Sequence, residues 1–339
     1  MLKVGVIGAT GYTGLELVRL LLQHPEVQLT TLTSERQAGV PYGRAFPQFQ
    51  DRVSLTLEKF DPAALAGKID FAFLCLPHHE AMDGARALLD QGIPVVDLSA
   101  DFRLRDVDTY QQWYGPHSQA ALLKEAVYGL PELYREEIKQ ARLVANPGCY
   151  PTSCILGLAP LIQKGLIDIK SIHCDSKSGV SGAGRSLNQD LLFCETNESL
   201  KAYKIGKHRH TPEIEQELSQ MADEAVKITF IPHLIPMDRG ILSTLYAKNT
   251  AGLDSKGLHE LYAAHYEKEP FVRLKELDAF PSTRDVYRSN YCDIGVYADE
   301  RTERIIVVSA IDNLTKGASG QAVQNMNLIQ GFPETTGLI

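Results

Sequence analysis

The first 150 residues alternate between short apolar runs and stretches with a helical period. Four apolar runs cover residues 3–7, 27–32, 71–76 and 95–98. Apolar residues recur three and four positions apart between the first two runs, and a second helical stretch covers residues 80–89. Short buried strands separated by amphipathic helices are typical of a parallel sheet with helices on both faces. The pattern predicts an α/β fold with a Rossmann-type doubly wound sheet.

Beyond residue 150 the apolar runs become longer and alternate with polar residues. Examples are residues 170–175, 226–231, 241–247 and 304–311. Alternation with a period of two indicates strands that bury one face, as in an antiparallel sheet covered by helices on one side. This half of the chain is therefore expected to form an α+β domain with a mainly antiparallel sheet.

The change of pattern divides the chain into two predicted domains. In this interpretation residues 1–148 form the Rossmann domain, and residues 149–313 form the α+β domain. A last helix is expected over about residues 316–329, and the segment 314–339 is expected to complete the first domain. With 339 residues, of which 44% are hydrophobic, the chain can fill two cores.

Composition argues against several classes of protein. The net charge is −8 and no basic run occurs, which argues against a nucleic-acid partner. The apolar runs are far shorter than the roughly 20 residues of a membrane helix, and the first residues enter a strand pattern at once instead of a secretion signal. The six cysteines have no CxxC spacing, which indicates neither a zinc site nor a disulfide scaffold. We therefore expect a cytoplasmic protein with reduced thiols, no bound metal and no membrane contact.

One cysteine is distinguished by its surroundings. Cys149 lies in the segment NPGCYPT, between a predicted strand end at residues 143–144 and a helix whose first turn is marked by Pro151 and Thr152. A helix N-terminus favours a thiolate over a thiol, so a cysteine there can titrate below the ordinary value of about 8.5. The N–H groups of the same turn can hold an oxyanion. Cys149 is a candidate nucleophile, with a small buried hydrophobic residue as the alternative interpretation.

A glycine-rich turn, GATGYTG, follows the first predicted strand and opens the first predicted helix. This setting is the one in which such a turn binds a dinucleotide, although the spacing is GxxGxxG instead of GxGxxG. The pyrophosphate is expected over the N–H groups of residues 10–13. For Tyr12 and Thr13 a helix start without a ligand is the alternative. The candidate cofactor residues of the turn are Gly8, Thr10, Gly11, Tyr12, Thr13 and Gly14.

The end of the second predicted strand bears on the choice of cofactor. An NAD enzyme usually has an acidic side chain there for the ribose 2′-hydroxyl, whereas this chain reads TSER from residue 33. Ser34 and the planar guanidinium of Arg36 suit a 2′-phosphate, so NADP(H) is favoured, and Glu35 keeps NAD open as the alternative. Pro77 and Ser99 follow the third and fourth strands and are expected to line the cofactor site at the carboxyl edge of the sheet.

A nicotinamide cofactor and a nucleophilic cysteine together indicate one chemistry. The thiolate adds to an aldehyde, a hydride passes to the cofactor, and inorganic phosphate cleaves the thioester to give an acyl phosphate. In reverse, the reaction reduces an acyl phosphate to an aldehyde. The expected small-molecule partners are an acyl phosphate or semialdehyde and inorganic phosphate.

Nine segments, in order and nearly from end to end of the chain, resemble the N-acetyl-gamma-glutamyl-phosphate reductases of arginine biosynthesis, within the aspartate-semialdehyde dehydrogenase superfamily. The segments are GATGYTG (8–14), LPH (76–78), DLSADFRL (97–104), YGLPE (128–132), NPGCYPT (146–152), SGVSGAGR (178–185), HRHTPEI (208–214), PHLIPMDRGI (232–241) and DNLTKGASGQAVQN (312–325). The resemblance implies NADPH-dependent reduction of N-acetyl-L-glutamyl 5-phosphate to N-acetyl-L-glutamate 5-semialdehyde and phosphate. It also implies a homo-oligomer, either a dimer or a tetramer.

The same resemblance implies roles for individual residues. Cys149 carries the acyl group as a thioester, and His208 is favoured as the acid/base. Ser181 and Gly182 approach the nicotinamide half of the cofactor, and Asn313 contacts its carboxamide. The last helix returns to the cofactor domain.

Two histidines precede a predicted helix start. His208 and His210 stand before Thr211 and Pro212, which predict an N-cap and a first helical residue, so both histidines are expected in a loop. His210 is a candidate to orient the substrate or its neighbour. A surface or hydrogen-bonded structural role is the alternative for both.

Three arginines in the motifs are candidates to bind the anionic substrate. Arg103 is the first choice for the phosphate, because its segment resembles the phosphate-contacting stretch of the aspartate-semialdehyde relatives. For Arg185 and Arg239 two interpretations stay open, the α-carboxylate of the substrate or a structural ion pair.

Three other functions remain open at this point. A reductase of a carrier-protein-linked aminoadipyl phosphate, in lysine biosynthesis, shares the core motifs, but the acidic chain has no basic cluster for such a carrier. A non-catalytic NADP-sensing regulator would need no reactive Cys149. A hydroxyacid dehydrogenase would not depend on Cys149 at all.

Overall fold

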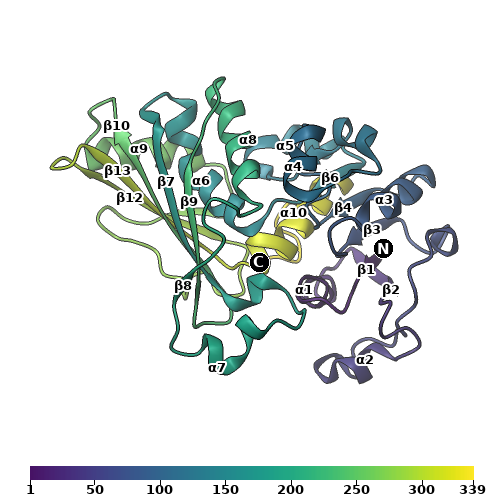
Figure 1. The fold of residues 1–339 in the computed structure, drawn as a ribbon. Helices are drawn as coiled ribbons and strands as arrows, with labels where there is room; N and C mark the ends of the chain where they lie inside the picture. Colours follow the sequence, from purple (N-terminus) through teal and green to yellow (C-terminus); the bar gives the residue numbers. More distant parts are fainter. The chain divides into compact units, whose positions relative to one another are not determined.

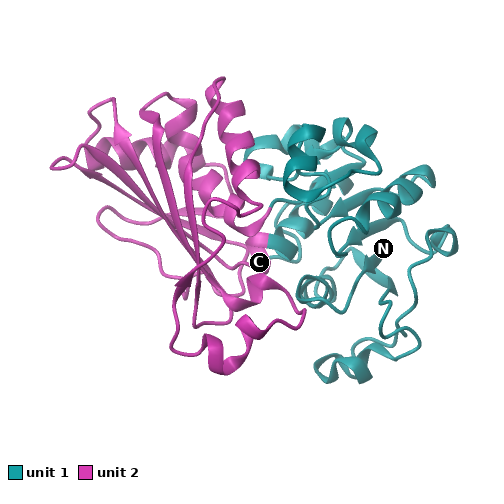
Figure 2. Ribbon diagram, in the orientation of Figure 1, with its two compact units in different colours: residues 1–147, 318–339 teal, residues 148–317 magenta.

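The structure is a computed structural model that describes residues 1–339, and it divides into two compact units (Figure 2). Unit 1 comprises Met1–Pro147 and Ala318–Ile339, and unit 2 comprises Gly148–Gly317. The chain therefore enters unit 2 one residue before Cys149 and returns to unit 1 for its last segment.

Unit 1 is built on a six-stranded parallel sheet with the order β2-β1-β3-β4-β6-β5 (Figure 1). Its strands are β1 (Leu2–Ile7), β2 (Val27–Leu32), β3 (Phe71–Leu74), β4 (Val95–Asp97), β5 (Val127–Tyr128) and β6 (Leu143–Ala145). Its helices are α1 (Tyr12–Leu21), α2 (Tyr42–Ala45), α3 (Ala81–Asp90), α4 (Val107–Tyr114), α5 (Pro131–Lys139) and α10 (Gly320–Gln330). The strand order reverses beside β1, and ligands of such sheets bind at the carboxyl ends of the strands next to that reversal.

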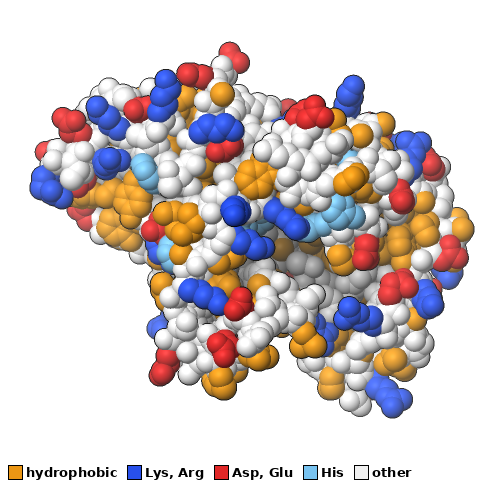
Figure 3. Space-filling model, viewed as in Figure 1, with side chains coloured by type: hydrophobic (Ala, Val, Ile, Leu, Met, Phe, Trp, Pro, Cys, Tyr) orange, Lys and Arg blue, Asp and Glu red, His pale blue; other side chains and the backbone are white.

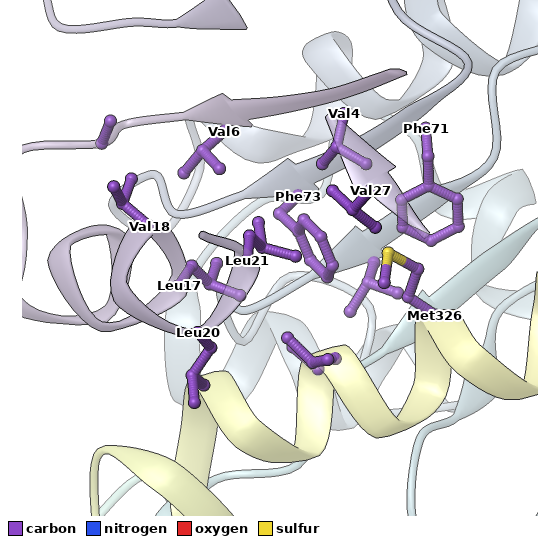
Figure 4. Close-up of a cluster of buried hydrophobic side chains, with 14 of the residues drawn as sticks. Val4, Val6, Leu17, Val18, Leu20, Leu21, Val27, Phe71, Phe73 and Met326 are labelled. Atoms are coloured by element: carbon purple, nitrogen blue, oxygen red, sulfur yellow. The ribbon is translucent and has the colours of Figure 1, made fainter. Parts of the chain in front are cut away.

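One core of unit 1 forms where strands of the sheet meet helices from opposite ends of the chain. Figure 4 shows Val6 of β1, Leu17 of α1, Phe73 of β3 and Met326 of α10 in one cluster, and all four are fully buried. The strand β3 reads FAFL and is buried at every position, as parallel strands between two helical layers must be. The hydrophobic effect therefore joins the first and last helices to the same sheet.

Polar contacts also attach α10 to unit 1. The Nδ2 of Asn325 donates to the carbonyl oxygen of Gly129 (2.9 Å) and to Oδ1 of Asn146 (3.1 Å). The Oγ of Ser319 donates to the carbonyl oxygen of Thr13 (2.8 Å). The C-terminal helix thus contacts both the glycine turn of α1 and the segment that leads to Cys149.

Unit 2 contains a seven-stranded mixed sheet with the order β11-β12-β13-β10-β7-β9-β8. Its strands are β7 (Ile167–Gly179), β8 (Lys201–Ala202), β9 (Thr229–Ile235), β10 (Ile241–Asn249), β11 (Val272–Leu274), β12 (Cys292–Asp299) and β13 (Arg304–Ile311). Its helices are α6 (Cys149–Gln163), α7 (Phe193–Thr196), α8 (Thr211–Ala222) and α9 (Ser255–Tyr266). The pairs β7–β9 and β11–β12 are parallel, and the other pairs are antiparallel.

The central helix of unit 2 is α6, which is buried around its whole circumference. Every residue from Tyr150 to Ile162 is buried, and the helix packs against α8, β10 and β13. A helix that is apolar on all sides must lie inside a core. In addition, the hydroxyl of Tyr262 on α9 donates to the carbonyl oxygen of Gly157 (2.5 Å). Cys149 therefore stands at the end of an element with little freedom to move.

The surface carries both signs of charge. In Figure 3, acidic and basic side chains are interspersed on the visible surface of each unit. None of the helices has the length and hydropathy that crossing a membrane requires. No group of three or more His, Cys, Asp or Glu side chains is placed to hold a metal ion.

The predicted fold class is confirmed in both halves of the chain. The strands predicted over residues 27–32 and 304–311 coincide with β2 and β13. The prediction of a strand from residue 226 is wrong at its start, because β9 begins only at Thr229. The N–H groups of Val226 and Ile228 donate instead to side chains of α8, Ser219 Oγ (2.9 Å) and Glu215 Oε1 (3.1 Å).

Replacing Met326 with alanine should leave a cavity in the core of unit 1 and lower its free energy of unfolding by about 3 kcal/mol. The fluorescence of Trp113, the only tryptophan and a residue of α4, reports unfolding of unit 1 in urea. Ile329→Ala is the matched control, because Ile329 is only partly buried against the same cluster, and about 1 kcal/mol is expected there. Equal losses in the two variants would contradict a central position for Met326.

Candidate functional site

The thiol of Cys149 stands on the first residue of α6. Strand β6 ends at Ala145, and Gly148 is the N-cap, with φ −68° and ψ 155°. Cys149 is half-buried, whereas Cys154, Cys174 and Cys292 are fully covered. A partly exposed thiol at a helix N-terminus is the arrangement that the sequence predicted for a nucleophile.

The segment before Cys149 is held by side chains of unit 1. Arg103 is buried, and its Nε donates to the carbonyl oxygen of Asn146 (2.8 Å) while its Nη2 donates to that of Leu98 (2.9 Å). The Nδ2 of Asn146 donates to the carbonyl oxygen of Ala318 (3.0 Å). The guanidinium thus lies against the strand ends of unit 1 and fixes the backbone three residues before the thiol.

Within unit 2, Glu213 contacts the same turn from α8. The N–H of Gly148 donates to Oε1 of Glu213 at 2.7 Å, and the carboxylate is only 1% exposed. The sequence analysis missed Glu213 because the contact joins residues 65 positions apart in the chain. Its position in the segment HRHTPEI was the only available signal.

The absence of a side chain at Gly317 makes space for the side chain of Cys149. A Cβ at position 317 would lie 2.8 Å from the Cβ of Cys149 and 3.3 Å from the carbonyl oxygen of Asp312. Any larger residue would therefore push the thiol from its place.

A chain of hydrogen bonds starts at His208. The N–H of His210 donates to Nδ1 of His208 (3.1 Å), so the neutral imidazole carries its proton on Nε2. That nitrogen lies 3.2 Å from the hydroxyl of Tyr203. Tyr203 donates to the hydroxyl of Tyr150 (3.3 Å), which donates to the carbonyl oxygen of His233 (3.0 Å). Every donor in the chain points the same way, and neither tyrosine was singled out from the sequence.

Burial keeps the hydrogen-bonded groups of His208, Tyr203 and Tyr150 uncharged. Burial, and then the positive charges of Lys204 and Arg209, lower the pKa of His208 to about 4. Burial raises the pKa of Tyr203 to about 12 and raises that of Tyr150 well above its ordinary value. At neutral pH the imidazole is therefore uncharged and both hydroxyls keep their protons.

The helix start near these histidines differs by one residue from the prediction. α8 begins at Thr211 with His210 as its N-cap, so Thr211 is not the cap and Pro212 is the second helical residue. A proline is tolerated anywhere in the first turn, because the N–H that it lacks has no partner there. His208 itself is in the loop, as expected, although it is buried.

Two other candidate arginines lie in different environments within unit 2. Arg239 is buried and forms a bidentate ion pair with Asp312, with Nε to Oδ2 at 3.0 Å and Nη2 to Oδ1 at 2.8 Å. Its Nη2 also donates to Oγ1 of Thr315 (3.0 Å). Arg185 is exposed, in the loop that follows β7. For Arg239 the structure therefore favours the ion-pair interpretation over the α-carboxylate one.

Two of the residues expected near the nicotinamide, Ser181 and Asn313, are buried and hydrogen-bonded to each other. The side-chain amide of Asn313 accepts from the N–H of Gly240 (2.7 Å) and donates to Oγ of Ser181 (3.0 Å). Ser181 donates in turn to the carbonyl oxygen of Asp238 (2.6 Å). Gly182, the next residue, is exposed. The structure therefore places Ser181 and Asn313 in contact, with Gly182 beside them.

The glycine turn of unit 1 has the shape that a dinucleotide requires. Gly8 has φ +87°, and a Cβ there would lie 2.5 Å from the carbonyl oxygen of Cys75. A Cβ on Gly14 would lie 2.6 Å from the carbonyl oxygen of Gly8. At Gly11 a Cβ would meet only that oxygen, at 3.9 Å. The fold itself thus requires Gly8 and Gly14, whereas Gly11 leaves open space over the start of α1 for a pyrophosphate.

The turn after β2 lies beside the glycine turn. Oγ1 of Thr10 and Oγ of Ser34 are 3.1 Å apart, and Ser34 is buried. Arg36 and Glu35 are exposed, but Oε1 of Glu35 accepts from the N–H of Phe60 (3.1 Å). One carboxylate oxygen of Glu35, the acidic side chain of this turn, is therefore hydrogen-bonded to backbone.

The turn after β4 is internally bonded. Ser99 is buried, and its hydroxyl donates to Oδ2 of Asp97 (2.7 Å) and accepts from the N–H of Asp101 (3.0 Å). Burial, and then the charge of Asp101, raise the pKa of Asp97 to about 7. Pro77, after β3, is exposed. Only Pro77 of this predicted pair therefore offers surface to a ligand without rearrangement.

Two family profiles match the chain, one in each half. Residues 3–141 match the profile described as semialdehyde dehydrogenase, NAD binding domain, and residues 149–313 match semialdehyde dehydrogenase, dimerisation domain.

Curated relatives match over the whole chain. Proteins named N-acetyl-gamma-glutamyl-phosphate reductase are 57% identical in Pelobacter propionicus, over 339 residues, and 58% in Geobacter metallireducens, over 340 residues. A third, from Desulfotalea psychrophila, is 52% identical over 339 residues. Each match covers 100% of this chain and 98% of the relative.

Solved structures share the fold at low sequence identity. Aspartate semialdehyde dehydrogenase II from Vibrio cholerae superposes with a TM-score of 0.74 at 18% identity, covering 98% of this chain and 99% of that one. Aspartate semialdehyde dehydrogenase with NADP from Candida albicans gives 0.73 at 17% identity, covering 97% and 99%.

The glycine turn generates a prediction that separates folding from cofactor binding. Gly14→Ala forces a backbone clash and should destabilise unit 1 by about 2 kcal/mol in urea unfolding followed by Trp113 fluorescence. Gly11→Ala should unfold like the parent but bind NADP about tenfold or more weakly in calorimetric titration, because its methyl group occupies the space for the pyrophosphate. Unchanged affinity in Gly11→Ala would contradict the placement of the cofactor.

The lowered pKa of His208 predicts a pH-dependent stability. Between the unfolded pKa of about 6.5 and the folded pKa of about 4, the unfolded chain binds the extra proton. Above pH 6.5 the titration of His208 therefore does not change the free energy of unfolding. As the pH falls from 6.5 to 4, it lowers the free energy of unfolding by up to about 3 kcal/mol. His208→Gln should flatten this loss in urea unfolding followed by circular dichroism. Parallel pH curves for the parent and the variant would rule out a buried neutral His208.

Proposed function

This chain belongs to the N-acetyl-gamma-glutamyl-phosphate reductase family, and from that premise we propose that it reduces N-acetyl-L-glutamyl 5-phosphate to N-acetyl-L-glutamate 5-semialdehyde with NADPH. The reaction releases inorganic phosphate and is a step of arginine biosynthesis. The observation that carries the proposal is the half-buried thiol of Cys149 on the first residue of α6. A sensor without chemistry needs no thiol in that position.

In the first half-reaction the thiolate of Cys149 attacks the acyl carbon of the substrate. A carbon–sulfur bond forms, the bond from carbon to the phosphate oxygen breaks, and phosphate leaves with the electron pair. The N–H groups at the start of α6 are suited to hold the oxyanion during the attack. The product of this step is a thioester on Cys149.

In the second half-reaction NADPH, when bound, supplies a hydride to the thioester carbonyl. The resulting oxyanion needs a donor, and we assign His208 as the acid/base for that oxygen, with its Nε2–H leaving Tyr203 to meet the oxyanion. The N–H of His210 fixes the proton on Nε2, and the hydroxyl of Tyr203 accepts from that nitrogen in the structure. Collapse of the intermediate releases the aldehyde and returns the thiolate of Cys149.

Arginines and His210 are proposed to bind the anionic substrate. Arg103 keeps its assignment to the phosphate, which is supported by a buried guanidinium at the carboxyl ends of the strands of unit 1. Exposed Arg185 is assigned to the α-carboxylate, with His210 as the residue that orients the substrate or His208. The charge of Arg239 is paired by Asp312, which supports a structural role.

NADP(H) is the proposed cofactor. The fit of the glycine turn, with open space at Gly11, supports a dinucleotide over the start of α1. The engagement of Glu35 by the N–H of Phe60 supports NADP over NAD, because it leaves Ser34 and Arg36 to meet a 2′-phosphate. Ser181, Gly182 and Asn313 are assigned to the nicotinamide half, and Pro77 and Ser99 keep their assignment to the cofactor site at the carboxyl edge of the sheet.

The protein is proposed to be a cytoplasmic homo-oligomer. The match of residues 149–313 to a dimerisation domain supports a homo-oligomer. The free thiols and the biosynthetic reaction support a cytoplasmic location.

The test is the initial rate of NADPH formation from N-acetylglutamate semialdehyde and NADP, with and without inorganic phosphate. A strong phosphate requirement is expected, because phosphate must cleave the thioester, and NAD should give a much lower rate. Cys149→Ala should abolish the rate, whereas Cys194→Ala, at an exposed cysteine, should leave it unchanged. A parent protein without any rate would sink the assignment, and activity on a carrier-linked aminoadipyl substrate would replace it.

A further inference from the structure

The first turn of α6 cannot cap itself. In a capping box the N-cap side chain bonds the N–H of the third helical residue, and a glutamate at that third position bonds the N–H of the N-cap. Here the N-cap is Gly148, which has no side chain, and the third helical residue is Pro151, which has neither an N–H nor a carboxylate. Both halves of the box are therefore missing from the helix that carries Cys149.

Glu213 supplies one half of the box from another helix. Its Oε1 accepts from the N–H of Gly148 at 2.7 Å, as a capping-box glutamate would. The carbonyl oxygen of Gly148 accepts from both the N–H and the Oγ1 of Thr152, each at 3.0 Å. Gly148 is thus held at both of its polar groups, and Cys149 is the next residue.

We propose that Glu213 is a positioning residue, whose carboxylate caps α6 from α8, fixes Cys149 relative to the start of α8, and limits how readily the thiol ionises. The proposal rests on the proposed function only in taking Cys149 as the nucleophile. It concerns the chain's own turn and needs no bound substrate or cofactor.

The positioning part follows from the place of Glu213 on α8. It is the third residue of that helix, and His208 lies three residues before the helix begins. The bond to Gly148 therefore ties the helix start that follows the acid/base to the helix start that carries the thiol. α6 and α8 pack directly against each other, so the bond sets the register of an existing contact.

The electrostatic part follows from burial. The side chain of Glu213 is 1% exposed, so little water lies between an ionised carboxylate and the turn to screen their interaction. A carboxylate beside a helix N-terminus stabilises the helix but opposes a second negative charge there. A thiolate that is stabilised too strongly is a weaker nucleophile, so this opposition keeps Cys149 reactive.

The experiment measures alkylation of Cys149 by iodoacetamide against pH, with the modified peptide quantified by mass spectrometry. Glu213→Gln keeps an oxygen that accepts from Gly148 but removes the charge, so the midpoint of alkylation should fall by about one pH unit. Glu213→Asp keeps the charge and should retain a midpoint close to that of the parent. A purely structural role would make aspartate, with its shorter reach, at least as disruptive as glutamine.

Glu217→Gln is the matched control. Glu217 is fully buried one turn further along α8, and it accepts from Nε2 of Gln216 (2.8 Å). Its variant should leave the midpoint of Cys149 alkylation unchanged. A Glu213→Gln profile that superimposes on the parent, or an equal shift in Glu217→Gln, would overturn the proposal.

Measurement of kcat and KM tests the role of Glu213 separately from the proposed reaction. If the assigned reaction is correct, Glu213→Gln should lower kcat more than it raises KM, because it changes the nucleophile and not the substrate contacts. If the parent shows no turnover at all, the assigned reaction fails while the alkylation profiles still decide the role of Glu213.

Discussion

The start of α6 is the constraint on which the rest of the candidate site depends. The first N–H groups of any helix have no partners inside the helix, and this is why a nucleophile gains from standing there. The same feature leaves the turn poorly fixed, the more so with Gly148 as a cap without a side chain. Order is restored by Glu213 of α8 on the N–H of Gly148 and by Thr152 of α6 itself on its carbonyl oxygen. Reactivity and rigidity are thus supplied by different parts of the chain.

The long path of the chain follows from that requirement. Strand β6 delivers the backbone to the turn, and Asn146 at its end is bonded by Arg103 from the β4 turn and by Asn325 from α10. Because α10 comes from the C-terminus, unit 1 is complete only when the last segment has returned. The buried amide of Asn325 is therefore explained by the segment that it holds, whereas Gln324 and Asn327 bond the residues that follow α10.

Features set by residues close together in the sequence could be predicted, and features set by contacts between distant residues could not. Period and turn chemistry are local, so β2, β13 and the helix start at Cys149 were predictable from neighbouring residues. The carboxylate of Glu213 and the hydroxyls of Tyr150 and Tyr203 were not, because their roles come from contacts that only the folded chain creates. The predicted start of β9 was wrong for a related reason, because side chains of α8 accept from the N–H groups that a strand would have paired.

The charge state of His208 indicates which kind of interaction it can make with an oxyanion. A neutral His208, with its proton fixed on Nε2, is a poor source of a full proton but a good donor of a hydrogen bond. The hydroxyls of Tyr203 and Tyr150 keep their protons as well, because burial raises the pKa of both groups. Reduction of a thioester passes through an oxyanion that can collapse by expelling the thiolate, without any net proton transfer. Donors that are already oriented, in a buried place, serve such an oxyanion better than a mobile proton would.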